Sequence, residues 1–171
     1  VYLGAAAGVS TGRFSGMRIS GDGFVAGPGV SLDRVLVSGS IELPDGETVE
    51  ARDLTVAGGT VSGGATVFLT GFFDAYYGRL AGSLTAILPA DATMGWRAAF
   101  HMDVKRFENY GVMTVVDTGA DEVPNWSRRT VLENLGEIRL TGAGKFGRTP
   151  GATVDEAARI VNRGKIVSSA S

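Results

Sequence analysis

Short apolar runs that alternate with small or polar residues fill the first half of the chain. Examples occupy residues 17–19, 35–37, 41–43, 54–56 and 66–70, all rich in Val, Leu, Ile and Thr. Side chains of a β-strand point to opposite faces with period two, so this alternation predicts short strands. Turn-forming pairs such as Gly58-Gly59 and Gly63-Gly64 separate the runs. We therefore predict a β-rich fold.

The second half repeats one pattern three times, in residues 107–115, 132–140 and 160–167. In each segment an apolar residue stands two positions before an Asn, a Gly stands two positions after it, and a strand-like run follows. The pairs are Asn109 with Gly111, Asn134 with Gly136, and Asn162 with Gly164. With the upstream turn glycines Gly39, Gly59 and Gly82, these glycines recur at intervals of 20 to 29 residues. Self-similarity at such a period is typical of repeat architectures.

Two interpretations of the Asn-x-Gly repeat stay open. In the first, each repeat is one coil of a β-solenoid. The Asn then lies at a left-handed bend, the Gly supplies a positive φ, and the stacked asparagines form an amide ladder. In the second, each repeat ends a helix. Residues 153–156 have the form of a capping box, and Gly164 would end that helix. The solenoid is our preferred interpretation.

These segments resemble the Asn-x-Gly-x-Ile turns of filamentous-haemagglutinin-like right-handed β-helices, whose coils occur in bacteriophage spikes, fibres and virion surface proteins. The resemblance covers roughly residues 105–168 and, more loosely, 35–88. It implies stacked coils and a role in an extracellular or virion assembly.

We accordingly predict an all-β fold, a β-solenoid of irregular 20–29-residue coils; a Gly-rich β-sandwich or barrel is the alternative. The chain is expected to form a single domain. Its expected parts are an N-terminal segment or assembly arm (1–34), early coils (35–70), an irregular aromatic-rich insertion (71–102) with a loop or short helix from residue 89, and the Asn-x-Gly coils (103–171).

Composition excludes further classes of protein and of functional site. The chain has 171 residues, 26 of them Gly, no Cys, one His and a net charge of −2. The absence of Cys excludes disulfides and thiol nucleophiles, and the charge disfavours nucleic acid as a partner. No run reaches the roughly 18 apolar residues of a membrane span. The opening residues 1–9 lack the basic flank of a secretory leader.

Candidate catalytic groups are sparse. His101 has Asp103 beside it but no recognisable nucleophile or metal-ligand set. The acidic clusters, Asp117 with Asp121 and Glu122, and Asp33 with Asp45, Glu47 and Glu50, have no EF-hand spacing. The glycine-rich stretch 58–64 lacks the Lys-Ser/Thr ending of a phosphate-binding loop. We therefore expect no enzyme, no metal and no cofactor.

A second group of side chains is suited to contacts with a partner or a glycan. These residues are aromatic or basic, and the four aromatic residues between positions 72 and 77 could form either a core cap or an exposed docking patch. They are Phe72, Phe73, Tyr76, Tyr77, Trp96, Trp126, Arg128 and Arg129.

The first functional hypothesis is a non-enzymatic structural protein of a virion or similar assembly, such as a capsid decoration, spike or fibre component. It would self-associate, with a homotrimer favoured, dock on other assembly proteins, and reach the virion surface after cytoplasmic synthesis. The first alternative is a glycan-binding or glycan-cleaving β-helix adhesin, and the second is a bactofilin-like polymerising scaffold. These alternatives would place the chain on a bacterial cell surface or in the cytoplasm.

Overall fold

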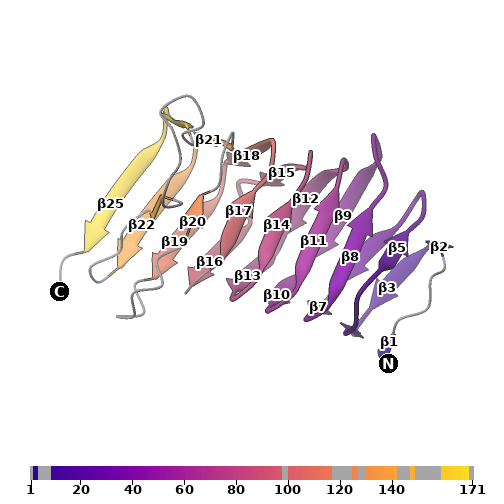
Figure 1. Ribbon diagram of the computed structural model, residues 1–171. Coiled ribbons are helices and arrows are strands. Elements are labelled where there is room, and N and C mark those ends of the chain that lie inside the picture. Colours follow the sequence, from indigo (N-terminus) through magenta and orange to yellow (C-terminus); the bar gives the residue numbers. More distant parts are fainter. Residues whose placement is uncertain are drawn as a thin grey trace.

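The structure is a computed structural model that describes residues 2–3, 9–97, 100–116, 125–126, 130–141, 147–148 and 159–169. Its strands wind into a parallel β-solenoid with three sheets, here called A, B and C (Figure 1). The chain visits the sheets in turn, and each strand pairs in parallel with the strand one coil away. This confirms the predicted all-β solenoid, and the sandwich or barrel alternative is wrong.

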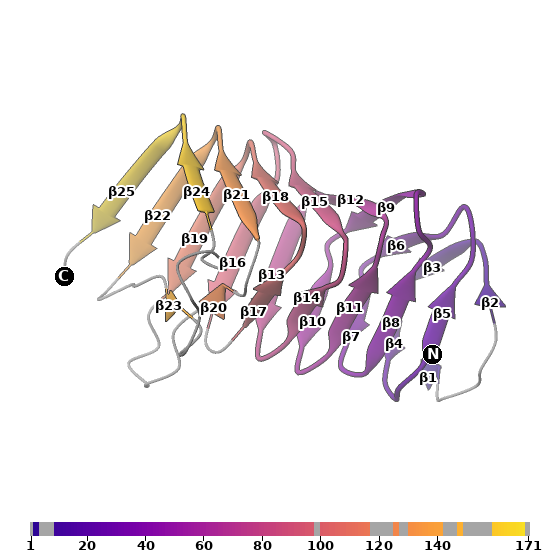
Figure 2. The same cartoon turned by 45° about the horizontal axis from the view of Figure 1, so that its top comes forward.

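The strand order within each sheet follows this winding, as Figure 2 shows along the edge of sheet C. Sheet A contains β1 (Tyr2–Leu3), β4 (Arg18–Ile19), β7 (Leu36–Val37), β10 (Thr55–Ala57), β13 (Phe72–Tyr76), β16 (Thr93–Arg97), β19 (Val112–Val116), β22 (Glu137–Thr141) and β25 (Lys165–Ser169). Sheet B contains β2 (Val9–Ser10), β5 (Phe24–Ala26), β8 (Ser40–Leu43), β11 (Thr60–Gly63), β14 (Arg79–Ala81), β17 (His101–Asp103), β20 (Asn125–Trp126) and β23 (Gly147–Arg148). Sheet C contains β3 (Arg13–Ser15), β6 (Ser31–Asp33), β9 (Thr48–Arg52), β12 (Thr66–Thr70), β15 (Thr85–Leu88), β18 (Arg106–Asn109), β21 (Val131–Asn134) and β24 (Arg159–Asn162).

The core is a set of columns of inward side chains that run along the solenoid axis. Strand β9 alternates exposed and buried positions over its whole length, with Val49 and Ala51 pointing inward. Val49 pairs with Val67 of the next coil, and Ala51 pairs with Leu69. The period-two alternation in the sequence therefore corresponds to alternating buried and exposed side chains. Every second residue of each strand adds to a column that neighbouring coils extend.

The expected irregular insertion at residues 71–102 is wrong. Strands β13 to β17 occupy this region and continue all three sheets, and the described residues contain no helix. The region looks irregular in sequence because its inward positions hold unusually large side chains. Phe73, Trp96 and Phe100 are fully buried, and the Trp96 indole Nε1 donates a hydrogen bond to the Phe100 carbonyl at 3.2 Å.

The coils differ in length, so no single repeat length describes the chain. The expected series of turn glycines combines glycines from three different corners of the solenoid. Asp53 and Phe72, 19 residues apart, contact each other across one coil, whereas Asn109, Asn134 and Asn162 are separated by 25 and 28 residues. Gly39 and Gly59 lie at the A–B corner and Gly82 at the B–C corner, while the Asn-x-Gly motifs form the C–A corner.

Glycine is required at the C–A corner by close approach rather than by a positive φ. Neither the three asparagines nor their partner glycines have a positive φ, so that part of the expectation is wrong. A Cβ at Gly136 would overlap the carbonyl oxygen of Gly111, and one at Gly164 would overlap that of Gly136. Backbones of successive coils therefore touch at this corner, and only Gly leaves room.

Candidate functional site

The C–A corner contains the expected amide ladder. The Asn109 amide Nδ2 donates to the Asn134 Oδ1 at 2.7 Å, and the Asn134 Nδ2 donates to the Asn162 Oδ1 at 2.6 Å. The same two Nδ2 atoms also lie 3.2 and 3.3 Å from the carbonyls of Glu137 and Lys165. The asparagines thus have a structural role in closing the corner, and the ladder is confirmed.

The competing helix interpretation fails for the part that the structure describes. Residues 159–162 form β24, which pairs in register with β21 and so brings Asn134 beside Asn162. The capping-box residues 153–156 lie outside the described residues. A strand at this position extends the same inward column that holds Asn109.

The predicted contact residues divide between the core and the surface. Phe73 and Trp96 are fully buried, so their expected role in surface contacts is wrong. Phe72, Tyr76 and Tyr77 have exposed fractions of 41%, 42% and 43%. The alternation of strand β13 explains the division, because Phe72 and Tyr76 share its outer face whereas Phe73 lies between them on the inner face.

The other predicted contacts stay predictions. The backbone of Trp126 pairs with that of Met102 in sheet B, but the side chain of Trp126 lies outside the description, as do Arg128 and Arg129. The acidic cluster of Asp117, Asp121 and Glu122 also falls outside it.

The outer face of sheet A has a shallow hollow around Gly95, which we call the sheet A hollow. Gly95 has an outward strand position but is itself buried, because the ends of Phe72, Asp74 and Arg97 close over it. The residues around it are Phe72, Thr93, Met94, Arg97, Val112, Thr114, Val116 and Arg139. Outward residues of three successive strands, β13, β16 and β19, thus surround one position without a side chain.

Charged groups border this largely apolar surface. The Arg97 Nε lies 3.1 Å from the Asp74 Oδ1, and Asp74 pairs directly with Gly95 across the sheet. The Arg139 Nε donates to the Glu137 Oε1 at 2.7 Å, and this hydrogen bond is the main reason why the pKa of Glu137 is lowered. The hollow therefore combines an aromatic ring, aliphatic groups and two guanidinium groups, the composition of a surface that binds a partner or a small ligand.

Gly95, Arg97 and Arg139 were not predicted from the sequence to be members of one site. The local signal was present, because Gly95 interrupts the strand-like run 93–97 between two large residues, Met94 and Trp96. Arg139 joins the site through pairing of Gly95 with Thr114 and of Thr114 with Arg139. That register crosses coils of unequal length, so spacing alone does not reveal it.

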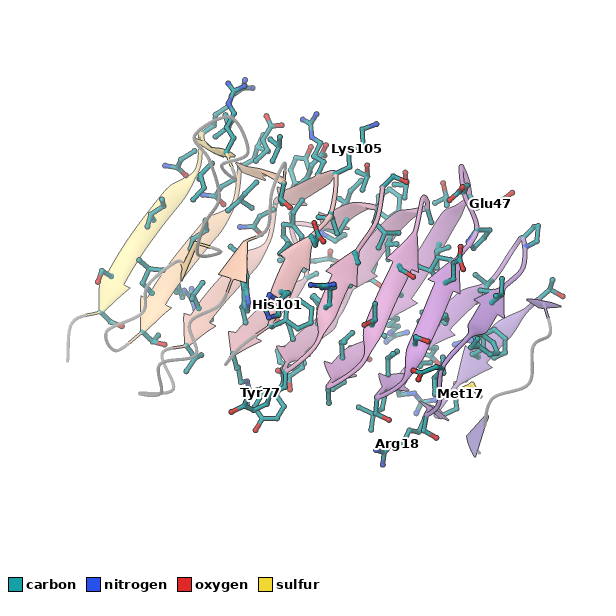
Figure 3. The ribbon with its side chains drawn as sticks, in the orientation of Figure 1. Met17, Arg18, Glu47, Tyr77, His101 and Lys105 are labelled. Carbon is teal, nitrogen blue, oxygen red and sulfur yellow. The ribbon has the colours of Figure 1, made fainter. Side chains whose placement is uncertain are left out.

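His101 lies on the outer face of sheet B, together with Asp103 and on either side of the buried Met102 (Figure 3). Burial is the first cause that lowers the pKa of His101, and the charge of Arg79 is the second. The two residues share one strand face, as their spacing predicts.

Two members of the second acidic cluster, Asp33 and Glu50, line one pocket together with Arg13 and Arg52. Asp33 is buried against basic residues, with the Arg13 Nη2 at 2.9 Å and the Arg34 Nη2 at 3.6 Å. Across the described ranges, no group of three or more His, Asp or Glu side chains is arranged to hold a metal ion. The glycines of residues 58–64 lie in and beside β10 and β11, at the corners of the solenoid.

No protein-family model, curated protein or solved structure matches this chain. Within the part of the chain that the structure describes, no helix has the length and apolar character to cross a membrane.

Proposed function

We propose that this chain is a non-enzymatic structural protein of a virion or similar assembly, with coils of the filamentous-haemagglutinin-like type. It acts as a rigid solenoid that self-associates through the outer face of sheet A. The observation that carries this proposal is the sheet A hollow, where Phe72 is 41% exposed beside a position without a side chain, Gly95.

The shape and composition of this face support association with further copies. A flat parallel sheet packs closely against another flat surface, and the missing side chain at Gly95 lets Phe72 lie low across the outer face. Val112 and Val116 extend the apolar surface beyond Phe72. Arg97 and Arg139 at its border supply polar contacts, as in the rim of a protein interface.

We expect a homotrimer, because three such faces can surround one axis and each then covers the hollow of a neighbour. Size-exclusion chromatography with light scattering should give three times the chain mass of 17.7 kDa. The variant Phe72→Lys should elute as a monomer, since it places a charge in the apolar contact.

Phe68→Lys is the matched control. Phe68 is also an outward phenylalanine, 36% exposed, but it lies on sheet C. This variant should keep the mass of the wild-type assembly. A monomeric wild-type protein that binds no sibling assembly protein contradicts the proposal, whereas filaments in electron micrographs would favour the bactofilin-like alternative.

A second candidate function, glycan binding, is favoured by the pair of Arg97 and Asp74 beside Phe72. An aromatic ring that can stack on a sugar stands next to a guanidinium and a carboxylate that can bind hydroxyl groups. A glycan array probed with the wild type, Phe72→Ala and the control Phe68→Ala tests it. Binding that only Phe72→Ala loses supports this function, and a blank array removes it.

A further inference from the structure

The corner between sheets A and B carries a second hollow, of about 300 Å³, which we call the corner hollow. Its lining consists of Gly58, Gly59, Thr60, Tyr77, Gly78, Arg79 and His101. Close backbone approach forms its floor, since a Cβ at Gly78 would meet the Gly59 carbonyl oxygen at 2.7 Å. Glycine leaves the surface open here. Most side chains that line the corner hollow are polar, whereas those around the sheet A hollow are largely apolar.

Three hydrogen-bond donors line up along one outward row of sheet B. Thr60 pairs with Arg79, and Arg79 pairs with His101, so the three residues belong to successive coils. Each is followed by a buried neighbour, and therefore each points away from the core. Adjacent strands lie roughly 4.8 Å apart, a spacing that lets a small ligand contact two of these side chains together.

The charges of this row are not balanced within the described part of the chain. Arg13, Arg97 and Arg139 each have a carboxylate within 4 Å. No described carboxylate comes this close to the guanidinium of Arg79 or the imidazole of His101. The described groups that act on His101 are Arg79 of β14 and Asp103 of its own strand. Two groups that can both carry positive charge thus lie side by side at the edge of a hollow.

We propose that the corner hollow binds an oxyanion group, a phosphate, sulfate or carboxylate, between Arg79 and His101. The planar guanidinium donates two parallel hydrogen bonds to such a group, and an imidazole N–H of His101 donates another. Tyr77, 43% exposed, also lines the hollow at this corner, and the body of the ligand lies against its ring. The site is distinct from the sheet A hollow and does not depend on self-association.

His101 provides a direct probe because it is the only histidine of the chain. Its imidazole resonances can be followed by NMR while sodium phosphate is added, with sodium chloride at equal ionic strength as the reference. We expect a saturable shift. We also expect the pKa of His101 to rise on binding, because the anion opposes the effects of burial and of Arg79.

Arg79→Gln should weaken phosphate binding about tenfold, since it removes a charge-assisted contact. Arg52→Gln is the control, because it removes the same charge from the outer face of sheet C, where Arg52 is paired with Asp53. It should leave the affinity unchanged. A wild-type resonance that moves no more with phosphate than with chloride overturns the proposal, and so does an equal response in Arg79→Gln.

Parallel titrations with sulfate, glucuronate and neutral glucose identify the source of the oxyanion. Glucuronate that binds more tightly than the inorganic ions assigns the site to an acidic sugar whose ring lies on Tyr77. Tighter binding of phosphate or sulfate assigns the site to a ligand that is a phosphate ester or a sulfate ester. Glucose that shifts His101 as strongly as glucuronate would contradict an anion site.

Discussion

Asn109 begins the amide ladder with a carbonyl oxygen that has no partner. Its Oδ1 is buried without a hydrogen bond among the described residues, while its Nδ2 donates toward Asn134. In the coil before it, the paired position holds Leu88, which offers no donor. The ladder therefore starts where an apolar column changes to a polar one, and this change carries a free-energy cost at Asn109.

Replacing Leu88 by Asn should extend the ladder by one rung. The new Nδ2 would donate to the Asn109 Oδ1, and this partly compensates for the loss of a buried leucine. Leu69→Asn is the matched control, because Leu69 is equally buried but its paired neighbour Ala51 has no amide. We expect Leu88→Asn to destabilise less than Leu69→Asn, by about 1–3 kcal/mol in urea denaturation. Equal losses would show that the orphan oxygen is unimportant.

Asp33 makes stability depend on pH. The hydrogen bond from the Ser15 hydroxyl at 2.7 Å, followed by that from Arg13 at 2.9 Å, lowers the pKa of its carboxyl group. A carboxyl group with a lower pKa in the folded than in the unfolded chain stabilises the fold above the unfolded pKa. This contribution is lost as the pH falls through the folded pKa.

We therefore expect Asp33→Asn to be less stable than the wild type at pH 7. The difference in urea midpoint should shrink when both proteins are measured near pH 3, about one unit below the ordinary pKa of aspartate. Glu42→Asn, at an exposed position on sheet B, is the control and should show no such convergence. A constant difference between the wild type and Asp33→Asn would contradict the assigned role.

At the scale of elements, the corners of the solenoid restrict the residue type at a position more than the strands do. The strands tolerate many residue types on their outer faces, but the backbones of successive coils touch at the C–A corner. This contact explains why the Asn-x-Gly motif recurs while the strands beside it vary. It also predicts that substitutions of glycine have different effects at corners and within strands.

Gly136→Ala should destabilise the fold by about 1–3 kcal/mol, because its Cβ would overlap the Gly111 carbonyl oxygen and the backbone cannot move aside without separating the coils. Gly95→Ala is the matched control. Its Cβ would meet the Asp74 Oδ1 at 3.3 Å and the end of Phe72 at 3.5 Å, groups that can shift. Thermal unfolding should show little change for Gly95→Ala, and a comparable loss in both variants would contradict this explanation.

At the scale of the molecule, the described strands of each coil pair with strands of the coils before and after it. The longest coils, with ladder spacings of 25 and 28 residues, stack on the same three sheets as the coil of 19 residues between Asp53 and Phe72. Extra residues therefore enter between strands without disturbing the pairing. This arrangement leaves separate faces for the two proposed functions, association on sheet A and anion binding at the A–B corner.

Period-two alternation and the Asn-x-Gly spacing are local signals, so they predicted short strands and favoured stacked coils with an amide ladder over the helical and sandwich alternatives. The sequence did not distinguish the buried Phe73 and Trp96 from the exposed Phe72 and Tyr76. Which residues of a strand point inward depends on how the chain turns at the corner before that strand. The tertiary structure alone decided which residues lie side by side. Gly95 and Arg139 share one outward row with Thr114 between them, and Arg79 pairs with His101, only through the register of coils whose lengths differ.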